Sequence, residues 1–373
     1  MHRVLVSGLY AGIGGFELGF QRSGHHTLLL CESNERAKAV LRRRFPEVTL
    51  ASDVAGLKSL PPETQVVAAG FPCQNLSMAG DKLGIEGDKS QIVQSLFRLV
   101  EARRVPWVVI ENVYFMLHLR RGAAMAAILA ELERLAYRWA YRVVDSRAFG
   151  LPQRRRRVFI VASQTGDPRD VLLSDDAPER HWPAIDLAHP IGFYWTEGRT
   201  GHGLTADAIP PLKAGSGLGI PSPPAVLLPS GRVVTPTIEA TERLQGFPAR
   251  WTTTREQSAW RYRWRLVGNA VSVPVAEWIG HRLMVPKVYE SSADLPLEDV
   301  DRWPSAAWSM GACRRVASVS EYPVHARRGR LSAYATHGWP DLSTRALAGF
   351  VSRAREGRLR YPKGFLAALE RNL

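Results

Sequence analysis

The sequence predicts an open α/β fold, and three observations support this class. Short apolar runs that suit buried strands recur along the first part of the chain. Several of these runs end abruptly at glycine or a charged residue, as strands do where they leave a sheet. Longer stretches with apolar residues at helical spacing separate the runs, an alternation typical of strands joined by covering helices.

The composition is that of a globular protein with a polyanionic partner. The chain has 373 residues, 45% of them hydrophobic and 23% charged, enough for two domains with a sizeable core. No apolar run approaches the roughly 20 residues that span a bilayer, and no signal peptide is evident, so we expect an intracellular protein. Three cysteines without C-x-x-C spacing argue against a zinc site or a disulfide framework. The net charge of +14 points to nucleic acid as the partner.

The first predicted strand, residues 4–6, runs into a glycine-rich turn at 10–15 and a helix that starts near Phe16. Glycines at a helix N-terminus let backbone N–H groups approach a ligand, although such a turn also serves other purposes. A second strand at 27–30 ends at Glu32, about 20 residues after the glycine turn, where a carboxylate can bind ribose hydroxyls. A solvated surface glutamate is an equally common interpretation. A third extended segment, 48–50, leads to Asp53.

The apolar run 66–69 ends in Gly70-Phe71-Pro72-Cys73-Gln74. This turn places the Cys73 thiol at the carboxyl edge of the sheet, where open α/β folds hold their ligands. The following loop contains three glycines within residues 80–87, which indicates a mobile flap over a reactive thiol. A lone cysteine is more often a buried structural residue, so the interpretation depends on its neighbours.

A helix over 90–103 leads to a strand at 106–110 that ends in Glu111-Asn112-Val113. Glu111 is therefore expected at the same sheet edge as Cys73, and a carboxylate there is costly unless it has a partner or a function. A helix at 123–135 and strands near 141–144 and 158–161 follow. Four arginines at 154–157 form either a solvated edge or an anion site.

The alternation stops at residue 164 and resumes only with a capped helix after Thr235 and a final helix at 274–284. We therefore predict five segments. They are a first catalytic part (1–163), a small inserted target-recognition domain with its hinge (164–266), the return helix of the catalytic domain (267–286), an acidic linker (287–301) and a basic C-terminal module (302–373).

Six signatures in one order give the chain a family resemblance. They are the glycine turn 10–15, Pro72-Cys73-Gln74, Glu111-Asn112-Val113, Gln153-x-Arg155-x-Arg157, Arg243 to Pro248 and Gly268 to Val271. Together they make residues 4–284 resemble a DNA (cytosine-5) methyltransferase of the bacterial and phage type. The resemblance implies a Rossmann-like, mostly parallel sheet of the S-adenosylmethionine-dependent methyltransferase class, with helices on both faces and an inserted recognition domain.

The resemblance also implies a chemistry and a set of site residues. Cys73 would add to C6 of a cytosine flipped out of duplex DNA, so that C5 takes a methyl group from S-adenosylmethionine and S-adenosylhomocysteine is released. Glu111 would act at N3, and Arg155 and Arg157 at the base carbonyl. Cofactor contacts are implied for Tyr10, Ala11, Gly12, Ile13, Gly14, Gly15, Glu32, Ser33, Asp53, Val54, Pro72, Asn269, Ala270 and Val271. Substrate contacts are implied for Gln74, Ser77, Arg232, Thr235 and Gln245.

The expected setting follows from the same resemblance. The enzyme would work as a monomer on double-stranded DNA in a bacterial cytoplasm, associated with the nucleoid, without a metal or a membrane. It would serve a restriction-modification or phage-defence system, with possible partner proteins from that system. A methyltransferase acting on tRNA and a catalytically silent DNA-binding homologue stay open as alternatives. A dinucleotide oxidoreductase would leave the thiol and arginine signatures unexplained.

Charge is unevenly spread along the chain. Residues 302–373 contain 13 Lys/Arg against 4 Asp/Glu, whereas residues 164–231 contain 4 against 8. An acidic recognition insert cannot supply the Coulomb attraction that DNA binding normally uses. We therefore expect the basic C-terminal residues to contact phosphates that flank the target site. A basic tail without a function, or one that binds a partner protein, is an equally common interpretation.

Overall fold

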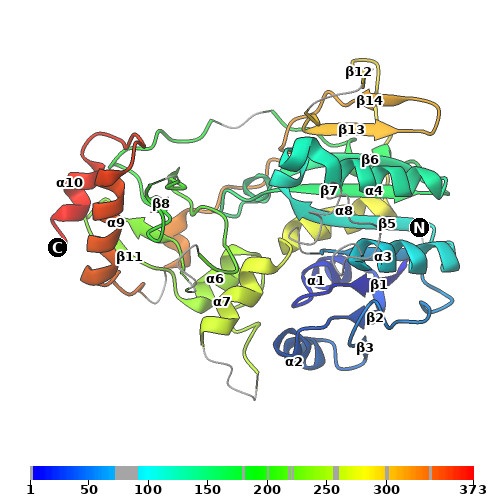
Figure 1. Ribbon diagram of the computed structural model, residues 1–373, viewed down its shortest axis with the longest axis horizontal. Helices are drawn as coiled ribbons and strands as arrows, with labels where there is room; N and C mark the ends of the chain where they lie inside the picture. Colours follow the sequence, from blue (N-terminus) through cyan, green and yellow to red (C-terminus); the bar gives the residue numbers. More distant parts are fainter. Residues whose placement is uncertain are drawn as a thin grey trace. The chain divides into compact units, whose positions relative to one another are not determined.

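The computed structural model describes residues 3–71, 91–178, 181–199, 201–216, 220, 222–254, 260–298, 302–335 and 338–373. The chain forms two compact units (Figure 1). The first unit comprises Met1–Asp145, Arg156–Pro178 and Val271–His325, and the second comprises Ser146–Arg155, Glu179–Ala270 and Ala326–Leu373.

The first unit contains a sheet with the strand order β12-β14-β13-β6-β7-β5-β4-β1-β2-β3. Strands β1 to β5 pair in parallel, whereas every pair from β5 to β12 along this order is antiparallel. The α/β class is confirmed, but the sheet is mixed rather than mostly parallel. The strands are β1 (Leu5–Leu9), β2 (His26–Cys31), β3 (Thr49–Ala51), β4 (Val66–Ala69), β5 (Trp107–Val113), β6 (Arg138–Asp145), β7 (Arg156–Ser163), β12 (Leu295–Pro296), β13 (Ala306–Ser309) and β14 (Arg314–Val316).

Helices cover both faces of this sheet. Helices α3 (Gln91–Arg103) and α4 (Ala123–Arg134) share one apolar core with alternate residues of the strands, such as Val67 and Ala69 of β4. Helices α1 (Gly15–Arg22), α5 (Pro168–Leu172) and α8 (Val273–Met284) pack together on the other face. Helix α2 (Glu35–Arg44) follows β2 and begins at Asn34, whose side chain accepts hydrogen bonds from two backbone N–H groups. Helices predicted at 90–103, 123–135 and 274–284 are confirmed to within a residue or two.

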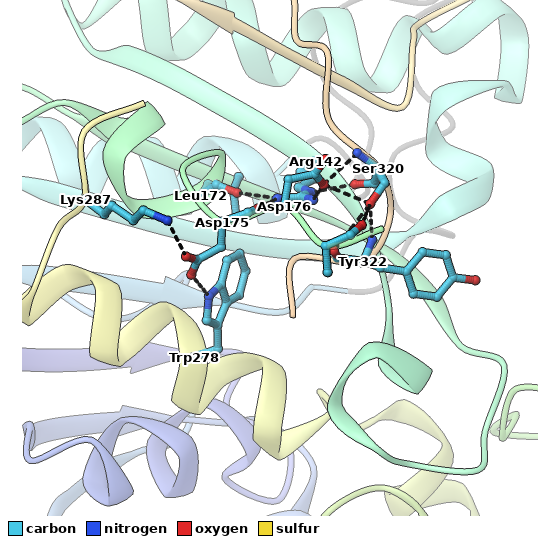
Figure 2. Close-up of polar contacts among 9 residues, drawn as sticks. Arg142, Leu172, Asp175, Asp176, Trp278, Lys287, Ser320 and Tyr322 are labelled. Atoms are coloured by element: carbon cyan, nitrogen blue, oxygen red, sulfur yellow. Dashed lines mark hydrogen bonds and ion pairs between the residues drawn. The ribbon is translucent and has the colours of Figure 1, made fainter. Parts of the chain in front are cut away.

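A buried arginine of β6 ties the sheet to the segments that follow α5 and β14 (Figure 2). Arg142 of β6 is fully buried, and its Nε donates to the Ser320 carbonyl at 2.7 Å. Its Nη2 lies 2.6 Å from Oδ1 of Asp176, which also accepts from the Ser320 backbone N–H. The adjacent Asp175 accepts from the Trp278 indole of α8 at 2.8 Å. Because burial disfavours the charged form, the pKa of Arg142 falls to about 10, and these partners offset much of that cost.

The second unit is built on a smaller antiparallel sheet with the strand order β11-β10-β8-β9. One core joins this sheet to two helices from the end of the chain: the Phe193 ring of β8 lies 4.9 Å from that of Phe350 and 5.4 Å from that of Phe365, centroid to centroid. The elements are β8 (Ile191–Phe193), β9 (Thr205–Ala206), β10 (Ala225–Leu227), β11 (Val233–Val234), α6 (Ile238–Leu244), α7 (Trp260–Asn269), α9 (Thr344–Glu356) and α10 (Phe365–Glu370).

The predicted linker at 287–301 and the separate module at 302–373 are corrected by this arrangement. Strand β13 pairs with β6, and β14 and β12 continue the same sheet, so the chain up to residue 325 belongs to the first unit. Asp294, within the predicted linker, is buried and accepts from the Tyr289 hydroxyl and the Trp308 indole. Residues 299–301 lie outside the described residues. The physical reasons are that an open edge at β6 needs a partner strand and that the apolar face of β8 and β10 needs cover.

This packing predicts that the C-terminal helices stabilise the second unit. Replacing the fully buried Phe350 with alanine should cost about 3–5 kcal/mol in the free energy of unfolding, because it removes a large apolar side chain and leaves a cavity. Urea titration followed by tryptophan fluorescence measures this change. Arg345→Ala, at an exposed position of the same helix, should stay within about 0.5 kcal/mol. A Phe350→Ala variant as stable as that control would contradict the assignment.

Candidate active site

The register of two parallel strands builds the centre of the site. Ala69 of β4 pairs with Ile110 of β5, so Gly70, which follows β4, lies beside Glu111 of β5. A Cβ atom built on Gly70 would lie 3.9 Å from Oε2 of Glu111 and 3.4 Å from a methyl group of Val271. Glycine therefore keeps the space beside the Glu111 carboxyl open. Glu111 was expected after the strand, whereas it lies within β5, which continues to Val113.

Glu111 is paired with an arginine from the antiparallel neighbour. Strand β7 pairs Val113 with Arg157 and Glu111 with Phe159, so the Arg157 and Glu111 side chains share one face of the sheet. The Arg157 Nε lies 3.2 Å from Oε1 of Glu111, and only 14% and 9% of these side chains are exposed. The fixed charge pair sits at the end of β5 with little access to water, where electrostatic interactions are strong.

An amide holds the segment that leads into the predicted nucleophile. Asn112 is buried, and its Nδ2 donates to the Phe71 carbonyl at 3.1 Å. This bond fixes the chain end of β4 to β5 directly before Pro72 and Cys73. Four predicted site residues lie outside the described residues: Pro72, Cys73, Gln74 and Ser77.

The predicted cofactor loop follows β1 and enters α1. Tyr10 adopts φ of 56°, a conformation rare for non-glycine residues, and its hydroxyl donates to the Ile92 carbonyl of α3 at 2.8 Å. Gly14 has φ of 83°, and a Cβ there would lie 2.4 Å from the Phe45 ring. The Ala11 N–H donates to the Cys31 carbonyl, which ties the loop to the end of β2. Ile13 lies in the same loop, between Gly12 and Gly15, and is fully buried.

Glu32 is the carboxylate that this loop holds in place. Its Oε2 accepts from the Gly12 N–H and its Oε1 from the Asn34 N–H, both at 2.8 Å. Burial raises the pKa of Glu32, and the backbone hydrogen bonds oppose that shift. Asp53 follows the neighbouring strand β3, is exposed and accepts from the Ala55 N–H. Ser33 is exposed next to Glu32, and Val54 is buried next to Asp53.

The last predicted cofactor residues lie where the chain passes from one unit to the other. Val271 belongs to the first unit, and a Cβ on Gly15 would lie 2.8 Å from its carbonyl oxygen. Glycine at position 15 therefore allows α1 to approach the backbone that begins α8. Asn269, which is exposed, and Ala270, which is buried, belong to the second unit.

Two predicted site residues, Arg155 and Gln245, have side chains that take part in a buried network of the second unit. The Arg155 guanidinium donates to the carbonyls of Gly268 at 3.2 Å and Ala270 at 2.8 Å. The Gln245 amide donates to the same Ala270 carbonyl, and its Oε1 accepts from Gln153 at 2.7 Å. Arg155 is 2% exposed, and Gln153 and Gln245 are fully buried. The Arg155 guanidinium and the Gln245 amide thus bind backbone carbonyls, and Gln153, which the sequence analysis named only as part of a signature, belongs to the same network.

The other predicted substrate residues of the second unit lie near its C-terminal segment. Arg232 is exposed, and its Nη2 lies 2.8 Å from Oδ1 of Asp341. The Thr235 N–H donates to the Pro340 carbonyl at 2.9 Å. Within the described ranges, no cluster of three His, Cys, Asp or Glu side chains is placed to hold a metal ion. The helices of the same ranges include none with the length and apolar character needed to cross a bilayer.

Comparisons with known proteins place this geometry in a family context. A family model described as C-5 cytosine-specific DNA methylase matches residues 5–192 and 230–284. The chain is 46% identical to the Type II methyltransferase M2.BsuMI of Bacillus subtilis, over 98% of this chain and 97% of that protein. It is 28% identical to the Type II methyltransferase M.NgoBI of Neisseria gonorrhoeae, over 72% of this chain and 89% of the relative.

Solved structures share the fold at low sequence identity. The S. pombe Dnmt2 methyltransferase matches with a TM-score of 0.55 at 16% identity, and the match covers 76% of this chain and 99% of that chain. The Entamoeba histolytica methyltransferase EhMeth matches with a TM-score of 0.57 at 14% identity and covers 77% of this chain and 100% of its own. At these identities the likeness shows the fold alone.

A second acidic residue, Glu17 of α1, is buried close to the predicted cofactor loop. Glu17 is 1% exposed, and its Oε2 has no hydrogen-bond partner among the described residues. A Cβ on Gly8 of β1 would lie 1.9 Å from its Oε1, so glycine at that position makes room for the carboxyl. Burial raises the pKa of Glu17 to about 8, and the charge of Glu32 adds to the shift.

This burial predicts a pH dependence of stability. A carboxyl whose folded-state pKa is raised stabilises the fold below its ordinary pKa, and this contribution is lost as pH rises toward 8. The free energy of unfolding should therefore fall from pH 5 to pH 8.5 by more in the native chain than in Glu17→Gln. Urea titrations of both proteins across this range measure the difference, with Glu47→Gln at an exposed position as the control. Equal slopes for Glu17→Gln and the native chain would contradict the prediction.

Proposed function

Since this chain belongs to the C-5 cytosine-specific DNA methylase family, we propose which of its residues carry out the reaction. The family reaction transfers a methyl group from S-adenosylmethionine to C5 of cytosine in DNA, and this chain is an enzyme of that class. The single observation that carries our assignment is the Glu111–Arg157 pair beside Gly70, at the strand end that leads into Cys73.

Cys73 is the proposed nucleophile. C5 of cytosine is a poor nucleophile, and addition of the Cys73 thiolate to C6 makes C5 electron-rich. After methylation, loss of the C5 proton and cleavage of the Cys73–C6 bond restore the aromatic base and the free thiolate. The base must leave the duplex to be reached, so a double-stranded substrate requires flipping. The Asn112–Phe71 hydrogen bond supports this assignment, because it fixes the chain directly before Pro72-Cys73.

Glu111 and Arg157 are the proposed partners of the flipped base. As the thiolate adds, negative charge develops on the pyrimidine at N3 and at the O2 carbonyl. Glu111 holds a proton at N3, and Arg157 stabilises the charge at the carbonyl oxygen. Their 3.2 Å contact orients both groups before substrate binds, which lowers the reorganisation needed during reaction. We assign Arg155 a structural role, since its guanidinium binds backbone carbonyls.

The residues at the ends of β1, β2 and β3 have the chemistry that S-adenosylmethionine requires. Glu32 is held by two backbone N–H groups, and its oxygens keep lone pairs for ribose hydroxyls. Asp53 supplies an acceptor for the adenine amino group, and the glycine loop supplies backbone N–H groups for the methionine end. When bound, S-adenosylmethionine supplies a methyl group on a sulfonium sulfur and becomes S-adenosylhomocysteine.

We propose a restriction-modification or phage-defence role for the enzyme. The 46%-identical relative is named as a Type II methyltransferase, and that match spans nearly all of both chains. In such a role the protein acts as a monomer on duplex DNA in the cytoplasm, at the nucleoid, and works with other proteins of the same system.

The covalent step gives a direct test. DNA that contains 5-fluorocytosine should trap Cys73 on the base when S-adenosylmethionine is present, because fluorine replaces the C5 proton whose loss precedes elimination. The adduct is measured as a protein–DNA band that survives denaturing electrophoresis. Cys73→Ala should form no adduct, whereas Cys313→Ala, which removes an exposed thiol, should form it like the native chain. A Cys73→Ala variant that methylates DNA at the native rate would overturn the mechanism.

The Glu111 assignment predicts a loss in the chemical step alone. Glu111→Gln keeps the shape of the side chain but removes the carboxyl, so the single-turnover rate should fall on the order of 10²-fold or more. Binding of S-adenosylmethionine, measured by calorimetry, should stay unchanged. Glu101→Gln, on the exposed side of α3, is the matched control. A native single-turnover rate in Glu111→Gln would remove Glu111 from the reaction.

A further inference from the structure

The end of the chain lies beyond the part that the family model matches. That model ends at residue 284, yet α9 and α10 complete the core of the second unit. Residues 326–373 contain ten Lys/Arg against three Asp/Glu, which makes this segment strongly basic. Packing of α9 and α10 into this core does not by itself require so many cations. In the described part of the chain, some of the cations make contacts within the fold and others do not.

The fold uses two arginines of α9. Arg353 donates to the carbonyls of Trp195 at 2.8 Å and Glu197 at 3.0 Å, which fixes α9 to the chain that follows β8. Arg355 donates to the Glu370 carboxylate of α10 at 2.7 Å. Arg353 is therefore bound to backbone carbonyls of the fold, and Arg355 is paired with a carboxylate of α10.

The turn between α9 and α10 is anchored from the inside. The Tyr361 hydroxyl donates to the Gly198 carbonyl at 3.0 Å, and its ring lies parallel to that of Phe365 with centroids 5.8 Å apart. Gly357 packs so closely on the same chain that a Cβ there would lie 2.8 Å from the Gly198 carbonyl oxygen. The Phe365 N–H donates to the Pro362 carbonyl, which closes the turn before α10. The backbone of residues 357–365 is therefore held at both ends and in the middle.

Three cations point outward from this frame. Arg358, Arg360 and Lys363 are exposed, whereas Leu359 and Tyr361 between them are half-buried. None of the three cations has a carboxylate within 4.0 Å among the residues that the structure describes. We define Arg358, Arg360 and Lys363 as the cationic turn.

We propose that the cationic turn binds phosphates of the DNA backbone outside the methylated base pair. This proposal rests on the proposed function, since it assumes duplex DNA as substrate. When unpaired cations bind phosphates, counterions of the DNA are released, and this release favours binding. Because the turn is held rigidly by the fold, its backbone loses little conformational entropy on binding. Within the second unit, residues 179–231 contain 3 Lys/Arg against 4 Asp/Glu, so the cationic turn supplies positive charge that this part of the unit does not have. Phosphate contacts position a protein on DNA without reading its sequence, so the turn adds affinity rather than specificity.

The salt dependence of binding tests the proposal. A triple variant, Arg358→Ala, Arg360→Ala and Lys363→Ala, should bind a labelled duplex with a shallower slope of log affinity against log salt concentration. Each lost phosphate contact should lower the slope by about 0.9, which gives a decrease of up to about 2.7 for three contacts. Fluorescence anisotropy at several sodium chloride concentrations measures the slope in the full-length protein.

A charge-matched variant separates local contacts from net charge. Arg36→Ala, Arg42→Ala and Arg43→Ala remove three cations from exposed positions of α2, and this variant should keep a slope close to the native one. Equal decreases in the two triple variants, or a native slope in the turn variant, would overturn the proposal. Methylation by the turn variant at low salt and saturating DNA should match the native rate. If the native protein did not methylate DNA, the proposed function itself would be contradicted.

Discussion

Parallel pairing of β4 with β5 is the constraint on which the rest of the site depends. It brings Gly70 beside Glu111, and the Asn112 amide then fixes the Phe71 carbonyl, so the chain leaves β4 in one direction. The antiparallel strand β7 adds Arg157 to the same face. A shift of one residue in either register would turn Glu111 to the opposite face of the sheet, because side chains alternate along a strand.

The C-terminal strands extend this sheet and are part of its stability. An open β6 edge would expose unpaired backbone groups, and β13 covers it. Arg142 then links β6 to the Ser320 carbonyl and the Asp176 carboxylate from inside the protein. Because Arg142 is fully buried, loss of these partners would leave its charge unsatisfied inside the protein. The chain beyond residue 284 is therefore part of both units rather than an appendage.

Three signature segments of the sequence meet in one buried polar network of the second unit. Gln153 and Arg155, Gln245, and the carbonyl of Ala270 come from segments far apart in the chain. The hydrogen bonds of this network fix the relative position of these segments within the unit. A signature can thus contain both an arginine that pairs with Glu111, Arg157, and an arginine that binds backbone carbonyls, Arg155, two residues apart.

The sequence by itself determined the fold class, the family and the strand ends at which Glu32, Glu111 and the Cys73 segment lie, because apolar runs and glycine turns are local features. It could not assign Arg155 or Gln245, since whether a polar side chain faces a substrate or a backbone carbonyl depends on segments distant in the chain. It also could not place the C-terminal strands and helices. Their apolar faces fit any exposed edge or sheet face, and only tertiary packing decided that β13 would pair with β6 and that Phe350 would cover Phe193.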